Sequence, residues 1–425
     1  MSEEIYSITP SDAMMLYATL IGSYTVRLRL RLDSPIDKNA MRKAIDKTSA
    51  RYPYLCVTLR KDNYKLYYEH NDKPVALINS LDKITLNSPE TNDHIWAICY
   101  EDCDLCLDFY HGRTDGTGIY FLLATLLYYY FSELYGSIDS RGIRTLEDPI
   151  REEEFIDPLC ELPDIDLGSL AAQASEPALN LIKNCGLSAA EGTGELLKIK
   201  IPESSFIPFT KAHDASPGVM ISVFIARAVE KICKGHTEPL IGSYVVNSRP
   251  MLGHSDTFHN CTSAVTLHYD ERVRKMPLET QCTVYRGKVF VQSDEDRVRR
   301  SMEISGSVGK MINGLPTLEQ KTRTSMQIAV DFYNSSTYYV SYVGKWQFPQ
   351  LGAHIKEFWT ITPAGPFPLS EITAVNGNIF VSMLQSFSER VLYDAFIEEL
   401  NINNIEFTEC GSEQIITANI NINNQ

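Results

Sequence analysis

Residues 104–116, DLCLDFYHGRTDG, pass from a strand pattern into a tight turn. From position 105 to His111, apolar residues and the histidine occupy every second position, which predicts a strand with one buried face. The glycine, threonine and aspartate that follow indicate a turn, and the apolar run 119–131 predicts a buried helix. His111 is therefore expected at a strand end, where the backbone is rigid and the adjoining loop leaves room for a ligand.

The spacing of His111, Asp115 and Gly116 has a chemical logic. An imidazole accepts a proton near neutral pH, so His111 is the candidate general base. Asp115 carries the charge to lock the turn through an ion pair. Gly116 permits tight packing at the helix entrance, and its missing side chain is expected to leave space beside His111. The motif alone leaves open that His111 only satisfies hydrogen bonds at a strand end.

The first half of the chain predicts a strand between two helices. Thr25–Leu32 alternates between aliphatic residues and arginines, which predicts a half-exposed strand. The Thr-Pro pair at 9–10 starts a helix before it. A second helix begins after Asp37 and ends at the Tyr-Pro pair at 52–53, before a strand over 55–59.

The second half loosely repeats this order of strand, helix and strand. Leu196–Ile201 alternates as a strand, the Ser-Pro pair at 216–217 starts an apolar helix, and Leu240–Val246 predicts the next strand. The Asn-Gly pair at 376–377 predicts a two-residue hairpin turn. Further strands and a closing helix are expected at 261–269, 337–343, 371–375, 379–385 and 388–400. The order indicates two α+β layers of mixed sheet and helix, side by side.

A change of character separates the halves. Between about residues 146 and 194, acids, prolines and small residues replace the periodic apolar pattern. We predict an N-terminal lobe over 1–160, a linker over 161–194 and a C-terminal lobe over 195–425. A chain of 425 residues is long enough for two such units.

Four segments together resemble a known superfamily. They are LDSPIDKNAMRKAIDKTSARYPYL at 32–55, HGRTDG at 111–116, VVNSRPML at 245–252 and VSYVG at 340–344. They are similar to the chloramphenicol-acetyltransferase-like, CoA-dependent acyltransferases, which include condensation domains and alcohol acetyltransferases. Tyr110 stands where condensation domains often have a first histidine, and the DFGWG motif of plant members is absent from the C-terminal part. These departures favour a bacterial-type or an alcohol acetyltransferase-like member, and the pattern is closest to the latter.

The resemblance implies an α/β pseudo-dimer of two similar lobes with a tunnel at their interface. His111 would take a proton from the acceptor as it attacks a thioester carbonyl, without a covalent acyl-enzyme. Asp115 would point away from the imidazole and pair with Arg249 of the other half. That pair would fasten the turn and join the lobes.

A tetrahedral oxyanion also needs hydrogen-bond donors. The candidates are Ser341, by its place in the late strand, and Thr262 or Ser263 in the segment NCTSAV. The alternative for each is a hydroxyl that bonds only within its own sheet.

Composition excludes several classes of function. The formal net charge of −15 opposes binding to nucleic acid or to an anionic lipid surface. No charged and apolar leader opens the sequence, and the run 119–131 is too short for a membrane span, so we expect a cytoplasmic protein. Ten scattered cysteines favour buried free thiols over a disulfide framework, and the grouping of Cys99, Cys103 and Cys106 lacks the partners of a zinc site. We expect no metal.

The expected function is transfer of an acyl group to a hydroxyl or amine of a small molecule. The donor would be acyl-CoA or a thioester on a carrier protein acting in trans. The basic clusters at 272–275 and 297–300 are interpreted as solvated faces and not as CoA sites. The alternative is a non-catalytic, condensation-like module that docks a carrier protein or a metabolite. A serine hydrolase is disfavoured because no GxSxG motif is present.

Overall fold

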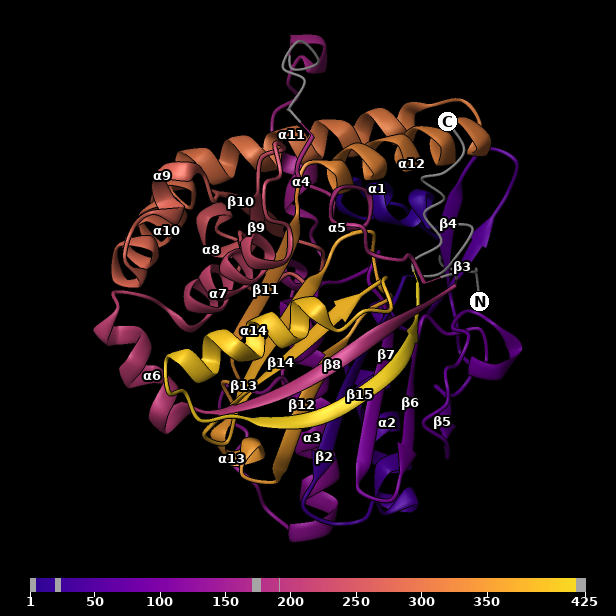
Figure 1. Cartoon of the computed structure of the whole chain (residues 1–425). Coiled ribbons are helices and arrows are strands. Elements are labelled where there is room, and N and C mark those ends of the chain that lie inside the picture. Colours follow the sequence, from indigo (N-terminus) through magenta and orange to yellow (C-terminus); the bar gives the residue numbers. More distant parts are fainter. Residues whose placement is uncertain (1–4, 20–23, 170–176, 191, 418–425) are drawn as a thin grey trace.

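The computed structural model describes residues 5–19, 24–169, 177–190 and 192–417. These residues form three β-sheets that helices cover (Figure 1). A five-stranded and a three-stranded sheet belong mainly to the first half of the chain, and a seven-stranded sheet belongs to the second half. The two halves lie side by side, as the indigo and the orange-to-yellow parts of Figure 1 show.

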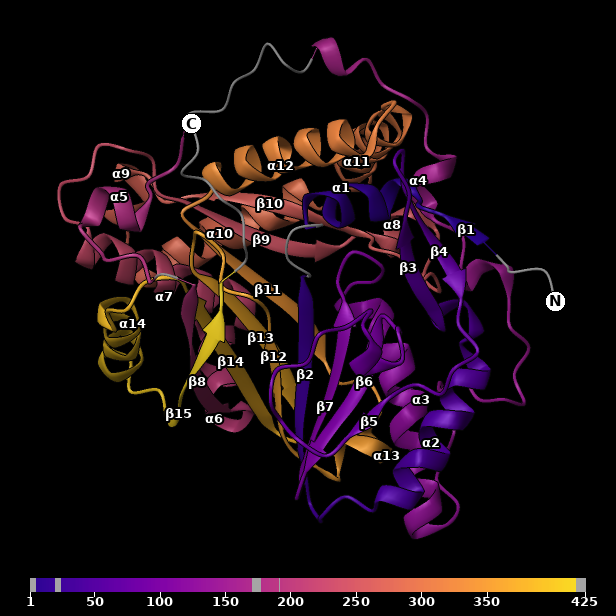
Figure 2. The ribbon, with the colours of Figure 1, turned by 90° about the vertical axis from the view of Figure 1, so that its right-hand side faces the viewer.

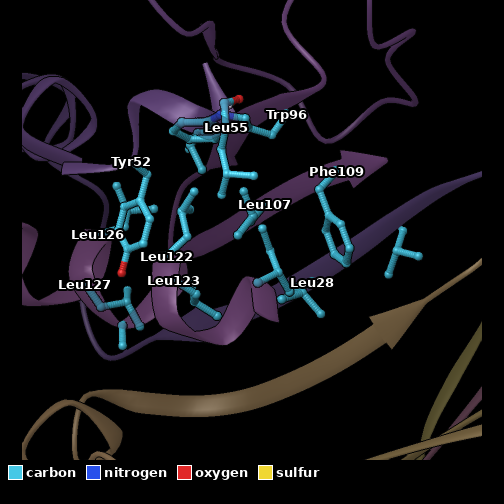
Figure 3. Close-up of a cluster of buried hydrophobic side chains, with 14 of the residues drawn as sticks. Leu28, Tyr52, Leu55, Trp96, Leu107, Phe109, Leu122, Leu123, Leu126 and Leu127 are labelled. Carbon is cyan, nitrogen blue, oxygen red and sulfur yellow. Dashed lines mark hydrogen bonds between the residues drawn. The ribbon is translucent and has the colours of Figure 1, made fainter. Parts of the chain in front are cut away.

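The five-stranded sheet has the strand order β12-β2-β7-β6-β5. Its hydrophobic face packs against α2 and α3, with Leu28, Leu107 and Trp96 in the buried cluster of Figure 3. The helix α3 is buried along much of its length, because leucines and aromatic residues occupy nearly all of its turns. The elements are β2 (Thr25–Leu32), α2 (Lys38–Arg51), β5 (Leu77–Ile78), β6 (Trp96–Glu101), β7 (Asp104–Tyr110), α3 (Gly116–Tyr135) and β12 (Ile355–Ile361).

A small sheet of order β1-β4-β3 lies beside α1 at the edge of the first lobe (Figure 2). Its strands are antiparallel, and Tyr68 of β4 is fully buried. The elements are β1 (Ile5–Ser7), α1 (Pro10–Ala18), β3 (Val57–Lys61) and β4 (Leu66–His70).

The seven-stranded sheet has the order β10-β9-β11-β13-β14-β8-β15. One of its faces packs against α7 and α14 in a second hydrophobic cluster. The elements are β8 (Thr193–Pro202), α6 (Glu203–Ala212), α7 (Pro217–Ile232), β9 (Ile241–Asn247), β10 (Thr262–His268), α10 (Leu278–Gln292), β11 (Tyr338–Lys345), β13 (Leu369–Val375), β14 (Asn378–Gln385), α14 (Val391–Ile402) and β15 (Thr408–Ile416).

Two parts of the second half cross into the first lobe. The strand β12 pairs antiparallel with β2, so a C-terminal segment completes the first lobe's sheet. The helices α11 (Glu295–Gly314) and α12 (Leu318–Asn334) pack against α1 and lie across the top of the molecule in Figure 2. The linker expected over 161–194 stays a prediction as the boundary between the lobes, because segments that follow it pack with the first lobe. Short helices complete the description: α4 (Pro158–Glu161), α5 (Leu181–Cys185), α8 (Arg249–Leu252), α9 (Glu271–Arg274) and α13 (Pro349–Gly352).

Most of the expected elements are present within a few residues of their expected bounds. The strand Thr25–Leu32 is β2 without a shift. The pair Asn376-Gly377 forms the turn between β13 and β14, with φ of 47° and 76° as such a hairpin turn requires. The sequence pattern led to no expectation for α10, α11, α12 or β12. No helix in the described ranges is both long and apolar enough to cross a membrane.

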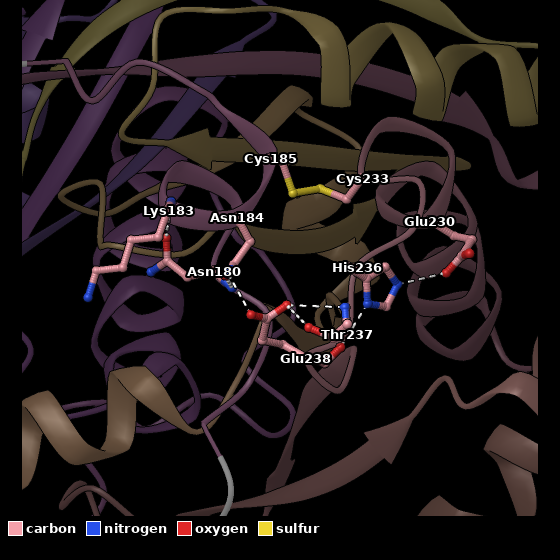
Figure 4. Close-up of a disulfide and its surroundings, with 9 residues drawn as sticks. All are labelled: Asn180, Lys183, Asn184, Cys185, Glu230, Cys233, His236, Thr237 and Glu238. Atoms are coloured by element: carbon pink, nitrogen blue, oxygen red, sulfur yellow. Dashed lines mark hydrogen bonds and ion pairs between the residues drawn. A yellow bond between two sulfur atoms is a disulfide. The ribbon is translucent and has the colours of Figure 1, made fainter.

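The prediction of free thiols is wrong for two cysteines. Cys185 at the end of α5 and Cys233 at the end of α7 form a disulfide, with their Cα atoms 5.1 Å apart (Figure 4). They are 48 positions apart and belong to no motif, so only the packing of α5 beside α7 reveals the pair. The other eight cysteines are free. The bond ties the end of the expected linker to the second lobe.

Replacing both Cys185 and Cys233 by alanine is expected to lower the free energy of unfolding by about 2–4 kcal/mol without reductant, because the bond closes a long loop in the unfolded chain. Urea unfolding with and without dithiothreitol measures this, and the reductant should remove the difference between variant and wild type. Cys160→Ala, at an exposed free thiol, is the control. Equal unfolding of the double variant and the oxidised wild type would contradict the bond.

Candidate active site

His111 follows the last residue of β7 and its backbone is held from two sides. Its N–H donates to the carbonyl of Tyr24 (3.1 Å), and its own carbonyl accepts from Nδ2 of Asn260 in the second half (2.8 Å). The ring lies 5.7 Å from the Tyr24 ring and 6.5 Å from the Phe109 ring, measured between centroids. Its Nδ1 is buried and has no hydrogen-bond partner in the described part of the chain. The backbone is therefore fixed, while one ring nitrogen is left without a protein partner among the described residues.

Asp115 is buried and satisfied on both carboxylate oxygens. It caps α3, because Oδ1 accepts from the backbone N–H of Gly118 (2.9 Å), while Oδ2 accepts from that of Cys261 (2.9 Å). Arg249 donates to both oxygens, at 2.7 and 2.9 Å. Burial by itself raises the pKa of Asp115, but Arg249 and the hydrogen bonds outweigh it and lower the pKa below its ordinary value.

Arg249 is as fully engaged as its partner. Its Nε donates to the carbonyl of Thr257 (3.0 Å) and its terminal nitrogen to that of His259 (2.6 Å). The ion pair expected from the resemblance is thus present, and it joins residues of the two halves of the chain. A bidentate pair at 1–3% side-chain exposure fastens the turn after His111 to the second half of the chain.

A second buried ion pair involves the motif, and no sequence pattern predicted it. Arg113 donates to Asp12 of α1 (2.9 Å) and lies over the rings of Tyr68 and Phe258, at 4.3 and 4.7 Å. His259 also contacts Asp12, with Nδ1 3.3 Å from Oδ1. The only signals in the sequence were the arginine inside the motif and the acid near the start of the first helix.

Glycines let neighbouring segments approach the motif. A Cβ on Gly116 would lie 2.8 Å from Cγ2 of Val343, so the glycine allows β11 to approach the motif this closely. The space expected beside His111 stays a prediction. A Cβ on Gly118 would lie 2.3 Å from the carbonyl oxygen of Phe258. That carbonyl accepts from the Thr114 hydroxyl (2.7 Å). The segment 257–261 of the second half therefore packs tightly against the motif and hydrogen-bonds to it. The residue types in this segment gave no indication of that role.

Comparison with known proteins identifies the arrangement of the lobes. No protein-family model matches the sequence, and a search of curated protein sequences finds no match. Polyketide synthase associated protein 5 from Mycobacterium tuberculosis superposes with a TM-score of 0.64 at 12% identity, over 94% of this chain and 98% of that one. TRI101 of F. sporotrichioides, complexed with coenzyme A and T-2, gives 0.60 at 10% identity over 96% and 100%. The first condensation domain of the CDA synthetase gives 0.60 at 12% identity over 96% and 100%.

The chain has the chloramphenicol-acetyltransferase-like fold. The fold class predicted from the sequence is therefore confirmed. At identities of 9–12% the likeness concerns the fold alone.

Within this chloramphenicol-acetyltransferase-like fold, the three candidate oxyanion donors differ in setting. Ser341 is half-buried on β11, opposite Glu371 of β13. Thr262 is exposed on β10, and Ser263 accepts a hydrogen bond from the Ser248 hydroxyl (3.1 Å). The oxyanion role of each residue stays a prediction. Ser263 already has a hydrogen-bond partner close to its own strand, the Ser248 hydroxyl.

A further pocket and the possible metal ligands are weaker candidates for a site among the described residues. A pocket of about 650 Å³ is lined by residues that include Arg51, Tyr128 and Arg151, but Arg51 is neutralised by Glu154 (2.8 Å) and Arg151 by Asp256 (2.7 Å). The described residues contain no group of three His, Cys, Asp or Glu side chains placed to hold a metal ion.

Asp115→Asn is expected to lower the free energy of unfolding by about 3–5 kcal/mol at neutral pH, because Arg249 would remain buried without a charged partner. The folded-state pKa of Asp115 is lowered, so its contribution is present above the unfolded value of about 3.9 and is lost as the pH falls through the folded value. The difference between wild type and variant should therefore shrink in acid. Urea unfolding at neutral and acidic pH measures it.

Asp46→Asn is the control for this prediction, since the Asp46 carboxylate is 61% exposed where it pairs with Arg42. Its effect should stay within about 1 kcal/mol. An equally small effect of Asp115→Asn would mean that the buried pair does not hold the lobes together.

Proposed function

We propose that this protein is an acyltransferase that moves an acyl group from a thioester to a hydroxyl or amine of a small molecule, with His111 as the general base. The observation that carries the proposal is the setting of His111. Both backbone polar groups of this residue are fixed by neighbours, whereas the buried Nδ1 has no partner among the described residues. Buried polar atoms are rarely left unpaired in native proteins, and the exceptions often lie in sites that bind ligands.

The fold adds support. TRI101 and the TRI3 trichothecene 15-O-acetyltransferase share it, and TRI101 was solved with coenzyme A. Acyl-CoA is accordingly the simplest donor, and a carrier-bound thioester supplied in trans is the second. No metal is needed for the proposed reaction.

The proposed step balances within one ternary complex. The imidazole of His111 accepts the proton of the acceptor O–H or N–H as the acceptor atom bonds to the thioester carbonyl carbon. The tetrahedral intermediate then collapses with cleavage of the C–S bond. The imidazolium returns its proton to the departing thiolate, so no residue remains acylated. Asp115 and Arg249 serve this step only by holding the backbone of the turn.

His111→Ala is expected to lower acceptor-dependent thiol release by about a hundredfold or more, because removal of a general base costs on that order. Thiol release is followed for a panel of acyl-CoAs with pooled small alcohols and amines. His70→Ala is the matched control, since His70 lies on β4 and pairs with Asp72 near the surface. Circular dichroism should show both variants folded.

Undiminished turnover in His111→Ala would refute the proposed base. A protein that binds an acyl-CoA or a carrier protein without turnover, and equally well in His111→Ala, would instead be the non-catalytic docking module.

A further inference from the structure

A buried carboxyl group lies where the second lobe's sheet meets the first lobe. Glu371 in β13 is 9% exposed. Its sequence neighbour Ile372 packs in the core of the second lobe, whereas Val375, which shares the face of Glu371, packs with residues of the first lobe. The Glu371 side chain therefore points between the lobes.

Polar residues continue from Glu371 across the neighbouring strands. Ser341 of β11 and Ser382 of β14 lie opposite it in register. The Ser341 hydroxyl bonds to the carboxylate, and the Ser382 hydroxyl is buried without a partner in the described chain. The next position in the row is Lys198 of β8, roughly 10 Å from Glu371 across two strand spacings. Lys198 is already bound to Glu413 and lies over the Trp359 ring.

Glu371 consequently has no cation. None of the ion pairs among the described residues includes it. Burial raises its pKa to about 7, and the hydrogen bond from Ser341 offsets only part of that effect. Tyr24 and Tyr120 lie near this carboxyl, and burial is the main cause that raises their pKa values above the ordinary value of 10. The charge of Glu371 is the next cause for Tyr120, whereas for Tyr24 it contributes less than the neighbouring Tyr333. Buried carboxylates are normally paired, so this one lacks the partner that its charge requires.

The same region contains further unsatisfied atoms and adjoins His111. Ser382 Oγ is buried without a partner in the described chain, as is Nδ1 of His111, whereas the Tyr120 and Thr360 hydroxyls interact with one another. The Tyr24 ring contacts the His111 ring, and the Tyr24 hydroxyl interacts electrostatically with the Glu371 carboxylate. Tyr24 thus lies between Glu371 and His111. Tyr24 is only half-buried, as are His111 and Ser341, so solvent reaches this interface.

We propose that Glu371 binds an ammonium group of the acceptor substrate, which makes the acceptor an amino alcohol or a diamine whose second polar end reaches His111. This inference rests on the proposed acyl transfer and names its acceptor class. An ammonium group supplies the missing positive charge and three hydrogen-bond donors, which match the Glu371 carboxylate and the unpartnered hydroxyl of Ser382. Glu371 is thus a specificity-determining residue that orients the acceptor.

The test measures binding and needs no turnover. Isothermal calorimetry with the His111→Ala protein compares α,ω-amino alcohols of about two to eight carbons with n-alcohols of matching length, at about pH 8, where the amine is protonated and the carboxylate is charged. The best amino alcohol should bind at least about tenfold more tightly than its n-alcohol counterpart. Glu371→Gln on the same background should abolish that preference. The control Glu409→Gln, on exposed β15, should retain it.

The pH dependence provides a second readout. At about pH 6 Glu371 is largely protonated, so the preference for the amine should decline, whereas Tyr24 and Tyr120 do not titrate between the two pH values. Because His111 is absent from the tested protein, it cannot cause the change. Glu371→Gln should fold, since loss of an unpaired buried charge is not destabilising.

No preference at any chain length, or a preference that survives Glu371→Gln, would overturn the inference. The result of this binding test is distinguishable from the result of the thiol-release test of the proposed function. Amine preference without thiol release in wild type would support Glu371 and refute acyl transfer, and turnover without the preference would do the reverse.

Discussion

The buried ion pair between Asp115 and Arg249 is the interaction on which the site depends. Asp115 uses one carboxylate to cap α3, bind Arg249 and accept from Cys261 of the second half. Because every charge and donor in this group is satisfied inside the protein, its cost of desolvation is offset only when both lobes are in place. The turn that carries His111 is thereby positioned by contacts from both halves of the chain.

The interface between the lobes contains both buried ion pairs and buried polar groups that lack a partner in the described chain. Arg113 of the motif and Asp12 of α1 form a second buried pair, and β12 completes the first lobe's sheet from the second half. Against this fixed frame, the ring of His111 and the carboxyl of Glu371 stand out as polar groups without a full set of partners. Buried polar groups without partners are exceptions in native proteins, and the two proposals made for His111 and Glu371 rest on that rule.

Local sequence pattern predicted the structure correctly where a short segment by itself determines a strand or a turn. The alternation over 25–32 defined β2 to the residue, and the Asn-Gly pair at 376–377 defined a hairpin turn. The pairing of Asp115 with Arg249 came from resemblance and not from spacing, since 134 positions separate the two residues. The disulfide between Cys185 and Cys233 was missed for the same reason, because nothing near either cysteine indicates its partner.

The sequence by itself determined the strand, the turn and the helix around His111, because period-two alternation, glycines and an apolar run act over a few residues. Only the tertiary structure decided what surrounds that histidine. The packing of 257–261 against the motif, the approach of Val343 to Gly116 and the unpaired carboxyl of Glu371 arise from strands distant in the chain that meet in one interface. Such meetings depend on the packing of whole sheets, which no local pattern encodes.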